Sequence, residues 1–189
     1  RLWFVYLGGF LLAVHYATIA YISSSLLKQY VGDTTLNVLY ILGALLSLCL
    51  LFLIPILIRK YSSNSLFIFF IILEIIAVLG MGKSHLAPLI ITLFIFQIAT
   101  QSVLYFLFDI NIEQEIRSEN TTGRKRGIFL TVQNTAWILS PLALTFLVIQ
   151  NNFGNVYLLS ATVLAPLLLI IGLFFKNSKE TPESATNMF

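Results

Sequence analysis

The chain has 189 residues, of which 58% are apolar and only 10% are charged. A soluble domain usually carries about 25% charged residues, so this composition excludes a soluble globular protein and indicates an integral membrane protein. The formal net charge of +3 does not indicate nucleic-acid binding, because the basic residues lie outside the apolar runs, where they set membrane orientation. The single cysteine, Cys49, excludes a disulfide framework within the chain.

Six apolar runs follow one another along the chain, each near the about 20 residues that a membrane-spanning helix needs. They predict transmembrane helices over residues 2–26, 35–58, 65–82, 86–110, 127–149 and 153–175. Their apolar positions run continuously and do not alternate, which argues against spanning strands. The expected fold is an all-α integral membrane domain over residues 1–175. The polar segment 176–189 is expected to be a cytoplasmic tail or the start of a linker.

Short polar segments mark the predicted helix ends. Asp33-Thr34-Thr35 and Ser62-Ser63-Asn64 are typical N-cap signals for the second and third helices. A proline in the first turn of the fourth helix is tolerated there. Prolines inside other helices of a membrane bundle usually kink a helix without ending it. These prolines are Pro88 in the first turn, and Pro55, Pro141 and Pro166 in helix interiors.

The basic residues predict the orientation of the chain. Nine of them fall on one side of the predicted helices, and two, Lys28 and Lys83, fall on the other. Cytoplasmic loops carry the excess of lysine and arginine, so both termini are expected in the cytoplasm. The expected membrane is a plasma membrane or a bacterial inner membrane. The nine are Arg1, Arg59, Lys60, Arg117, Arg124, Lys125, Arg126, Lys176 and Lys179.

Polar side chains inside three of the predicted helices are candidates to line a solute pathway. Residues four apart lie on one helix face, so Gln97, Gln101 and Tyr105 share a face of the fourth helix. Residues three or seven apart also share a face, so Asn134, Trp137, Pro141 and Thr145 share a face of the fifth helix, and His15, Thr18 and Ser25 share one of the first. The alternative is that these groups join helices by hydrogen bonds; that alternative is favoured for Thr18, Ser25 and Thr145. The pathway candidates are His15, Gln97, Gln101, Tyr105, Asn134 and Trp137.

Two ionisable residues inside apolar runs are candidate proton sites. His15 is of the residue type that titrates near neutral pH, although a lone helix histidine also serves as a neutral hydrogen-bonding group. Glu74 is the carboxylate deepest in an apolar run. A charge facing lipid there would be costly, so Glu74 is expected either to be protonated or to turn toward a partner helix.

The sequence predicts no enzyme, metal site or cofactor. The two histidines, His15 and His85, lie in opposite halves of the membrane and lack the spacing of metal ligands. No Cys-His or Ser-His-Asp grouping has a plausible shared site. Membrane lipid and a small solute are the expected partners.

Two basic loops carry a likeness to a known family. Arg124-Lys125-Arg126-Gly127 opens the fifth helix and is followed by Asn134 and Ser140-Pro141. The segment from Pro55 to Ser62, with Arg59-Lys60, joins the second and third helices. This arrangement resembles the amino-terminal half of a major facilitator superfamily transporter, over nearly the whole chain. Here Ser140 replaces the glycine of the family's Gly-Pro, and the loop of Arg59-Lys60 lacks the family's two glycines and its aspartate.

The resemblance implies a six-helix half made of two three-helix repeats. It implies a secondary transporter, or half of one, which moves a small solute by alternating access between two such halves, in one longer chain or in a homodimer. The alternative is a non-transporting membrane scaffold or sensor on the same fold. The family's gate pairs an acid of the second loop with a base at the fourth helix; here the signs are exchanged. The expected cytoplasmic gate comprises Arg59, Lys60, Asp109, Glu113, Arg126 and Gly127. The alternative is that these charges are solvated at the level of the lipid headgroups and serve only to set the topology.

Overall fold

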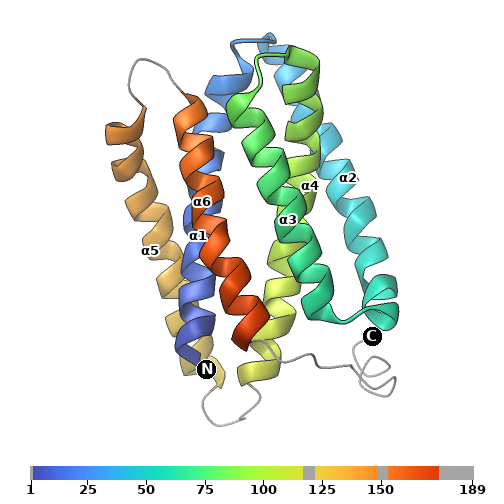
Figure 1. Cartoon of the computed structure of the whole chain (residues 1–189), viewed down its shortest axis with the longest axis vertical. Helices are drawn as coiled ribbons and strands as arrows, with labels where there is room; N and C mark the ends of the chain where they lie inside the picture. The colour runs from blue at the N-terminus through green and yellow to red at the C-terminus, as the bar shows by residue number, and fades with distance from the viewer. Residues whose placement is uncertain (1, 117–121, 149–152, 175–189) are drawn as a thin grey trace.

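The computed structural model describes residues 2–116, 122–148 and 153–174, and these fold into six α-helices without a strand (Figure 1). All six are long and apolar enough to cross a membrane, which confirms the predicted all-helical class and the number of spans. The helices are α1 (Leu2–Leu27), α2 (Asp33–Lys60), α3 (Ser63–Lys83), α4 (Ala87–Ile116), α5 (Thr122–Leu147) and α6 (Phe153–Phe174).

The predicted bounds were wrong where charged residues border an apolar run. Helix α4 continues to Ile116 instead of ending at residue 110, and α5 begins at Thr122 instead of residue 127. The reason is that Glu, Gln and Arg form helices well, so charges end the hydrophobic stretch without ending the helix. At 30 and 26 residues, both helices are longer than the about 20 residues that a membrane span needs. The predicted tail, 176–189, lies outside the described residues.

One predicted cap is correct and one is wrong. Ser62 caps α3, because its hydroxyl accepts a hydrogen bond of 3.2 Å from the backbone N–H of Ser65. Helix α2 already begins at Asp33, with Gly32 at the N-cap and no side-chain cap. The Asp33 carboxylate instead forms an ion pair of 2.8 Å with Lys28. The three interior prolines, Pro55, Pro141 and Pro166, lie inside helices as expected.

Helices α1, α3, α4 and α6 form the centre of the bundle, and α2 and α5 lie at opposite flanks (Figure 1). Helix α1 packs along α5 and α6, whereas α4 packs along α2 and α3. Helices α3 and α6 pack on each other, and α1 makes a smaller contact with α4. Only 17% of the span of α2 and 22% of the span of α5 are buried, against 44–56% for the other spans. The two flanking helices therefore present most of their surface outward.

The buried apolar residues form two clusters, one toward each end of the bundle. On α1, Leu12 belongs to the cluster at the N-terminal end and Ile19 to the other, and His15 lies between them. Glu74 has the same intermediate position on α3. A layer of buried polar side chains therefore crosses the middle of the bundle.

Two glycines mark close approaches between a flanking helix and the centre. A Cβ added at Gly9 of α1 would lie 2.2 Å from the Phe129 ring of α5, which stacks on Phe108 and cannot swing away freely. A Cβ added at Gly43 of α2 would lie 2.7 Å from Cδ1 and 3.0 Å from Cβ of Ile98 on α4. Because that Cβ is fixed to the backbone, the helices themselves would have to separate.

Gly43→Ala is therefore expected to lower the free energy of unfolding by about 1–3 kcal/mol through overpacking. The measurement is the unfolding of the purified protein in detergent. Gly127→Ala is the control, since nothing lies within 4 Å of a Cβ added at Gly127 on α5; it should be neutral or stabilise by up to about 1 kcal/mol through helix propensity. Equal stability of Gly43→Ala and the native protein would contradict the close packing of α2 on α4.

Candidate functional site

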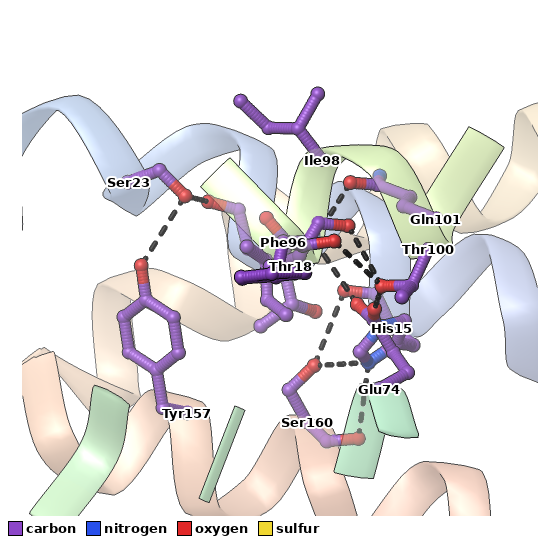
Figure 2. Close-up of polar contacts among 12 residues, drawn as sticks. His15, Thr18, Ser23, Glu74, Phe96, Ile98, Thr100, Gln101, Tyr157 and Ser160 are labelled. Atoms are coloured by element: carbon purple, nitrogen blue, oxygen red, sulfur yellow. Dashed lines mark hydrogen bonds and ion pairs between the residues drawn. The ribbon is translucent and has the colours of Figure 1, made fainter. Parts of the chain in front are cut away.

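Six buried polar side chains from four helices meet in the middle of the bundle. His15 and Glu74 have no exposed surface, and the other four are at most 6% exposed. Polar groups inside a membrane bundle are costly unless they find partners there, so such a concentration marks the candidate site. The polar layer consists of His15 (α1), Glu74 (α3), Gln97, Thr100 and Gln101 (α4), and Ser160 (α6); Figure 2 shows several of its contacts.

The Glu74 carboxylate lies at the centre of the polar layer. Its Oε1 lies 3.1 Å from His15 Nε2 and accepts a hydrogen bond from Gln97 Nε2 at 3.0 Å. Its Oε2 accepts a short hydrogen bond from the Thr100 hydroxyl. Gln97 Nε2 also donates to Gln101 Oε1 at 2.7 Å. Gln97 and Thr100 thus direct donors at both oxygens of the carboxyl group, an arrangement that suits the ionised form, which can only accept.

The other ring nitrogen of His15 faces α6. His15 Nδ1 lies 2.7 Å from the Ser160 hydroxyl and 3.3 Å from the Ser160 carbonyl oxygen. The same hydroxyl is also 3.2 Å from the backbone carbonyl of His15. The imidazole therefore bridges α3 and α6, with a hydrogen-bonding partner at each nitrogen.

The sequence indicated His15 and Glu74 as separate candidates, and the structure brings them into direct contact. Glu74 turns toward partner helices α1 and α4, which was one of its two expected arrangements. Sequence reasoning missed Thr100 and Ser160. The signal for Thr100 was its position three residues after Gln97, on the same helix face. The Ser160 hydroxyl gave no such signal.

An aromatic group adjoins the polar layer on the side of α1, α4 and α5. The ring centroids of Tyr16 and Tyr105 are 4.5 Å apart, and those of Tyr16 and Trp137 are 6.1 Å apart. Tyr21 packs edge-on against Trp137 at 5.9 Å. Tyr105 follows Gln101 by one turn of α4. The structure thus brings together the predicted pathway residues Tyr105 and Trp137, from different helices.

The predicted pathway face of α5 meets the rest only in part. Asn134 is exposed and is not in contact with the polar layer in the described part of the chain. The reason is that α5 packs on α1 through its Trp137 side, which leaves Asn134 outward. Thr18 is buried and donates to its own helix at the Val14 carbonyl. Ser25 and Thr145 are exposed, so they do not line this site.

The predicted gate pair between the Arg59-Lys60 loop and Asp109 is wrong, because Asp109 has a different partner. Asp109 forms its ion pair with Arg126 of α5, at 3.4 Å, whereas no ion pair links Arg59 or Lys60 to Asp109 or Glu113 among the residues described. The reason is that Asp109 lies on the side of α4 that faces α5, whereas Arg59 and Lys60 end α2 on the opposite flank. Both partners are more than half exposed, so the pair contributes about 0–1 kcal/mol.

A cavity of about 300 Å³ lies between α4 and α5 beside this ion pair. Its charged and amide groups lie beside aromatic rings, and Tyr105 belongs both to its lining and to the aromatic group. The cavity, Tyr105, Gln101 and the polar layer therefore follow one another along α4. The lining residues are Tyr105, Phe106, Phe108, Asp109, Ile112, Arg126, Phe129, Leu130 and Gln133.

Within the described residues, no group of three or more His, Cys, Asp or Glu side chains has an arrangement that would hold a metal ion. Comparisons of the chain with protein-family models, with curated proteins and with solved structures gave no match.

Proposed function

We propose that this chain is one half of a secondary transporter, which moves a small solute across a membrane by alternating access. The half has the organisation of the major facilitator superfamily, with two three-helix repeats. The proposal gives the chain no catalytic role and requires a second six-helix half, either in the same longer chain or in a second copy.

The observation that carries the proposal is the pattern of helix packing. The pattern is unchanged when α1 and α4, α2 and α5, and α3 and α6 exchange places: the α1–α5 and α1–α6 packings become α4–α2 and α4–α3, while α3–α6 and α1–α4 become themselves. Helices α1 and α4 run in opposite directions (Figure 1). Such a pattern is what an inverted repeat of three helices produces, and inverted repeats are typical of secondary transporters.

The exposed helices support the requirement for a second half. Helices α2 and α5 are the least buried spans, and they occupy equivalent places in the two proposed repeats. Large apolar side chains on both face outward, among them Phe52 of α2 and Phe146 of α5, which are 78% and 80% exposed. A second half packed against these helices would enclose the aromatic group and the cavity between α4 and α5.

The test is solute movement by the purified chain in sealed vesicles. The vesicles are loaded with a mixture of small metabolites, and each solute that leaves is identified by mass spectrometry against protein-free vesicles. The proposal expects protein-dependent, saturable loss of at least one solute. Folded protein in bilayers that moves none of them, at any density that permits pairing, would favour the scaffold or sensor instead.

The orientation proposed for the chain is a separate prediction. With Cys49 replaced by serine, a cysteine at Gly123 should be protected from an impermeant maleimide in intact cells, whereas one at Gly32 should react. Both glycines have open space around them, with nothing within 4 Å of an added Cβ, so neither substitution disturbs packing. The reason is the excess of basic residues at the end that contains Gly123. Reaction of the cysteine at position 123 without reaction of the one at position 32 would show that the orientation is the opposite of the predicted one.

A further inference from the structure

The two ionisable side chains of the polar layer each lie beside a hydroxyl that has a second acceptor within reach. Thr100 Oγ contacts Glu74 Oε2 and also lies 3.1 Å from the carbonyl oxygen of Phe96. Ser160 Oγ lies 2.7 Å from His15 Nδ1 and 3.2 Å from the carbonyl oxygen of His15. A hydroxyl has one hydrogen and donates to one acceptor at a time. The Gln97 carbonyl oxygen is a third acceptor for Thr100 Oγ, at 3.1 Å, so each hydroxyl has at least two alternative hydrogen-bonding arrangements.

We propose that the His15–Glu74 pair is a reversible proton-binding site, in which the Thr100 and Ser160 hydroxyls exchange acceptors as the proton arrives or leaves. The site follows from the geometry alone. In transport, this proton would serve as the coupling ion, a role that rests on the proposed function.

The pair is electrically neutral when His15 is an imidazolium and Glu74 is a carboxylate. Glu74 is then ionised and accepts its three hydrogen bonds, and the imidazolium donates from Nε2 to Glu74 and from Nδ1 to Ser160. Neutrality is favoured because a net charge buried in a bilayer is costly.

In the gain step, an O–H bond of a hydronium ion breaks to leave water, and the proton forms an O–H bond at Glu74 Oε2. The new O–H donates to Thr100 Oγ, and the Thr100 hydrogen turns to the Phe96 carbonyl. Loss of a proton to water leaves His15 Nδ1 as an acceptor. The Ser160 hydrogen then turns from the His15 carbonyl to Nδ1. In each step one proton moves and every polar atom of the pair keeps a partner, so no unsatisfied group arises.

Among the described residues, no other charged side chain contacts the pair, so a net charge on the pair would be uncompensated. Tyr16 on α1 packs edge-on against Tyr105 on α4. Tyr157 on α6 hydrogen-bonds to Ser23 instead. On α2 and α5, the described charged residues lie toward the helix ends. Proton exchange therefore changes the net charge at the meeting point of α1, α3, α4 and α6, which biases one bundle conformation over another if their hydration differs.

The test is infrared spectroscopy of the full chain in lipid bilayers over a pH series, in water and in deuterium oxide. The carbonyl stretch of one protonated carboxyl group should appear on acidification, shift in deuterium oxide, and be absent from Glu74→Gln.

Thr100→Val should raise the titration midpoint by about one pH unit, because the carboxylate loses a charge-assisted hydrogen bond that is stronger than the bond lost by the acid. Thr92→Val is the control on the same helix, since Thr92 is exposed and donates only to the Pro88 carbonyl; it should leave the midpoint unchanged.

A Glu74 carboxyl band that stays constant over the whole series, or one that never appears, would overturn the proposal. So would equal midpoints in Thr100→Val and Thr92→Val. A second measurement needs no change at the site: in His85→Gln, which leaves His15 as the chain's one histidine, the nitrogen NMR signals should change with pH. Titration without solute movement in vesicles would contradict the transporter and leave the proton site standing. Solute movement without titration would do the reverse.

Discussion

Glu74→Leu is expected to lower the free energy of unfolding by about 3–5 kcal/mol, because it removes one partner of a fully buried pair. His15 Nε2, Gln97 Nε2 and the Thr100 hydroxyl would each lose their acceptor on Glu74. An uncompensated polar group costs most where water cannot reach it. The measurement is the unfolding of the purified protein in mixed detergent micelles, followed by circular dichroism.

The double variant His15→Leu, Glu74→Leu separates the pair from its surroundings. Removing both ionisable groups leaves no unpaired charge, so the double variant should be less destabilised than the two single changes together. Glu113→Leu is the control, since Glu113 is an exposed carboxylate on α4, and it should stay within about 0.5 kcal/mol of the native protein. Strict additivity of His15→Leu and Glu74→Leu would mean that the two side chains do not stabilise each other.

Tyr105→Ala and Trp137→Ala are each expected to slow solute movement about tenfold or more, which corresponds to about 1.4 kcal/mol of lost stabilisation. Tyr105 contributes to the cavity wall and packs on Tyr16, which also contacts Trp137. Removing either ring leaves the solute without an aromatic contact on that side and loosens the α1–α4–α5 junction. Initial rates in the vesicle assay measure the effect, at matched protein density.

Phe69→Ala is the matched control for these variants. Phe69 is an aromatic side chain of α3 that is 54% exposed, and it lies outside the cavity, the aromatic group and the polar layer. Its removal should leave the rate within about twofold of the native protein. Equal losses in Phe69→Ala and Tyr105→Ala would attribute the effect to general destabilisation and contradict the pathway.

The six spans could be predicted because apolar runs of membrane length leave little choice of structure. The helix ends could not, since charged residues such as Glu113 end the apolar run and still favour helix. The sequence also could not predict which neighbouring helix a charged residue faces: Asp109 pairs with Arg126 on α5 and not with Arg59 on α2. Which helices neighbour one another is decided by packing among all six, and close approaches such as Gly43 on Ile98 help to fix it.

The site was only partly predictable for the same reason. Spacing within one helix placed Gln97, Gln101 and Tyr105 on a common face, and the structure joins the first two by a hydrogen bond. The contact between His15 and Glu74 links positions far apart in the sequence. It depends on the rotation of α1 and α3 about their own axes, which a pattern of nearly continuous apolar residues does not specify.

The most direct test of the transporter proposal is the accessibility of a cysteine at Tyr105, in the Cys49→Ser background, to an impermeant maleimide added from either side of the native membrane. Alternating access predicts reaction from both sides, with reaction from one side blocked when the other conformation is trapped. Ile76→Cys, at an exposed position on α3 that does not line the cavity, should react from neither side. Lack of reaction at Tyr105→Cys from both sides would show that this face meets lipid or protein and not water, which contradicts a solute pathway along α4.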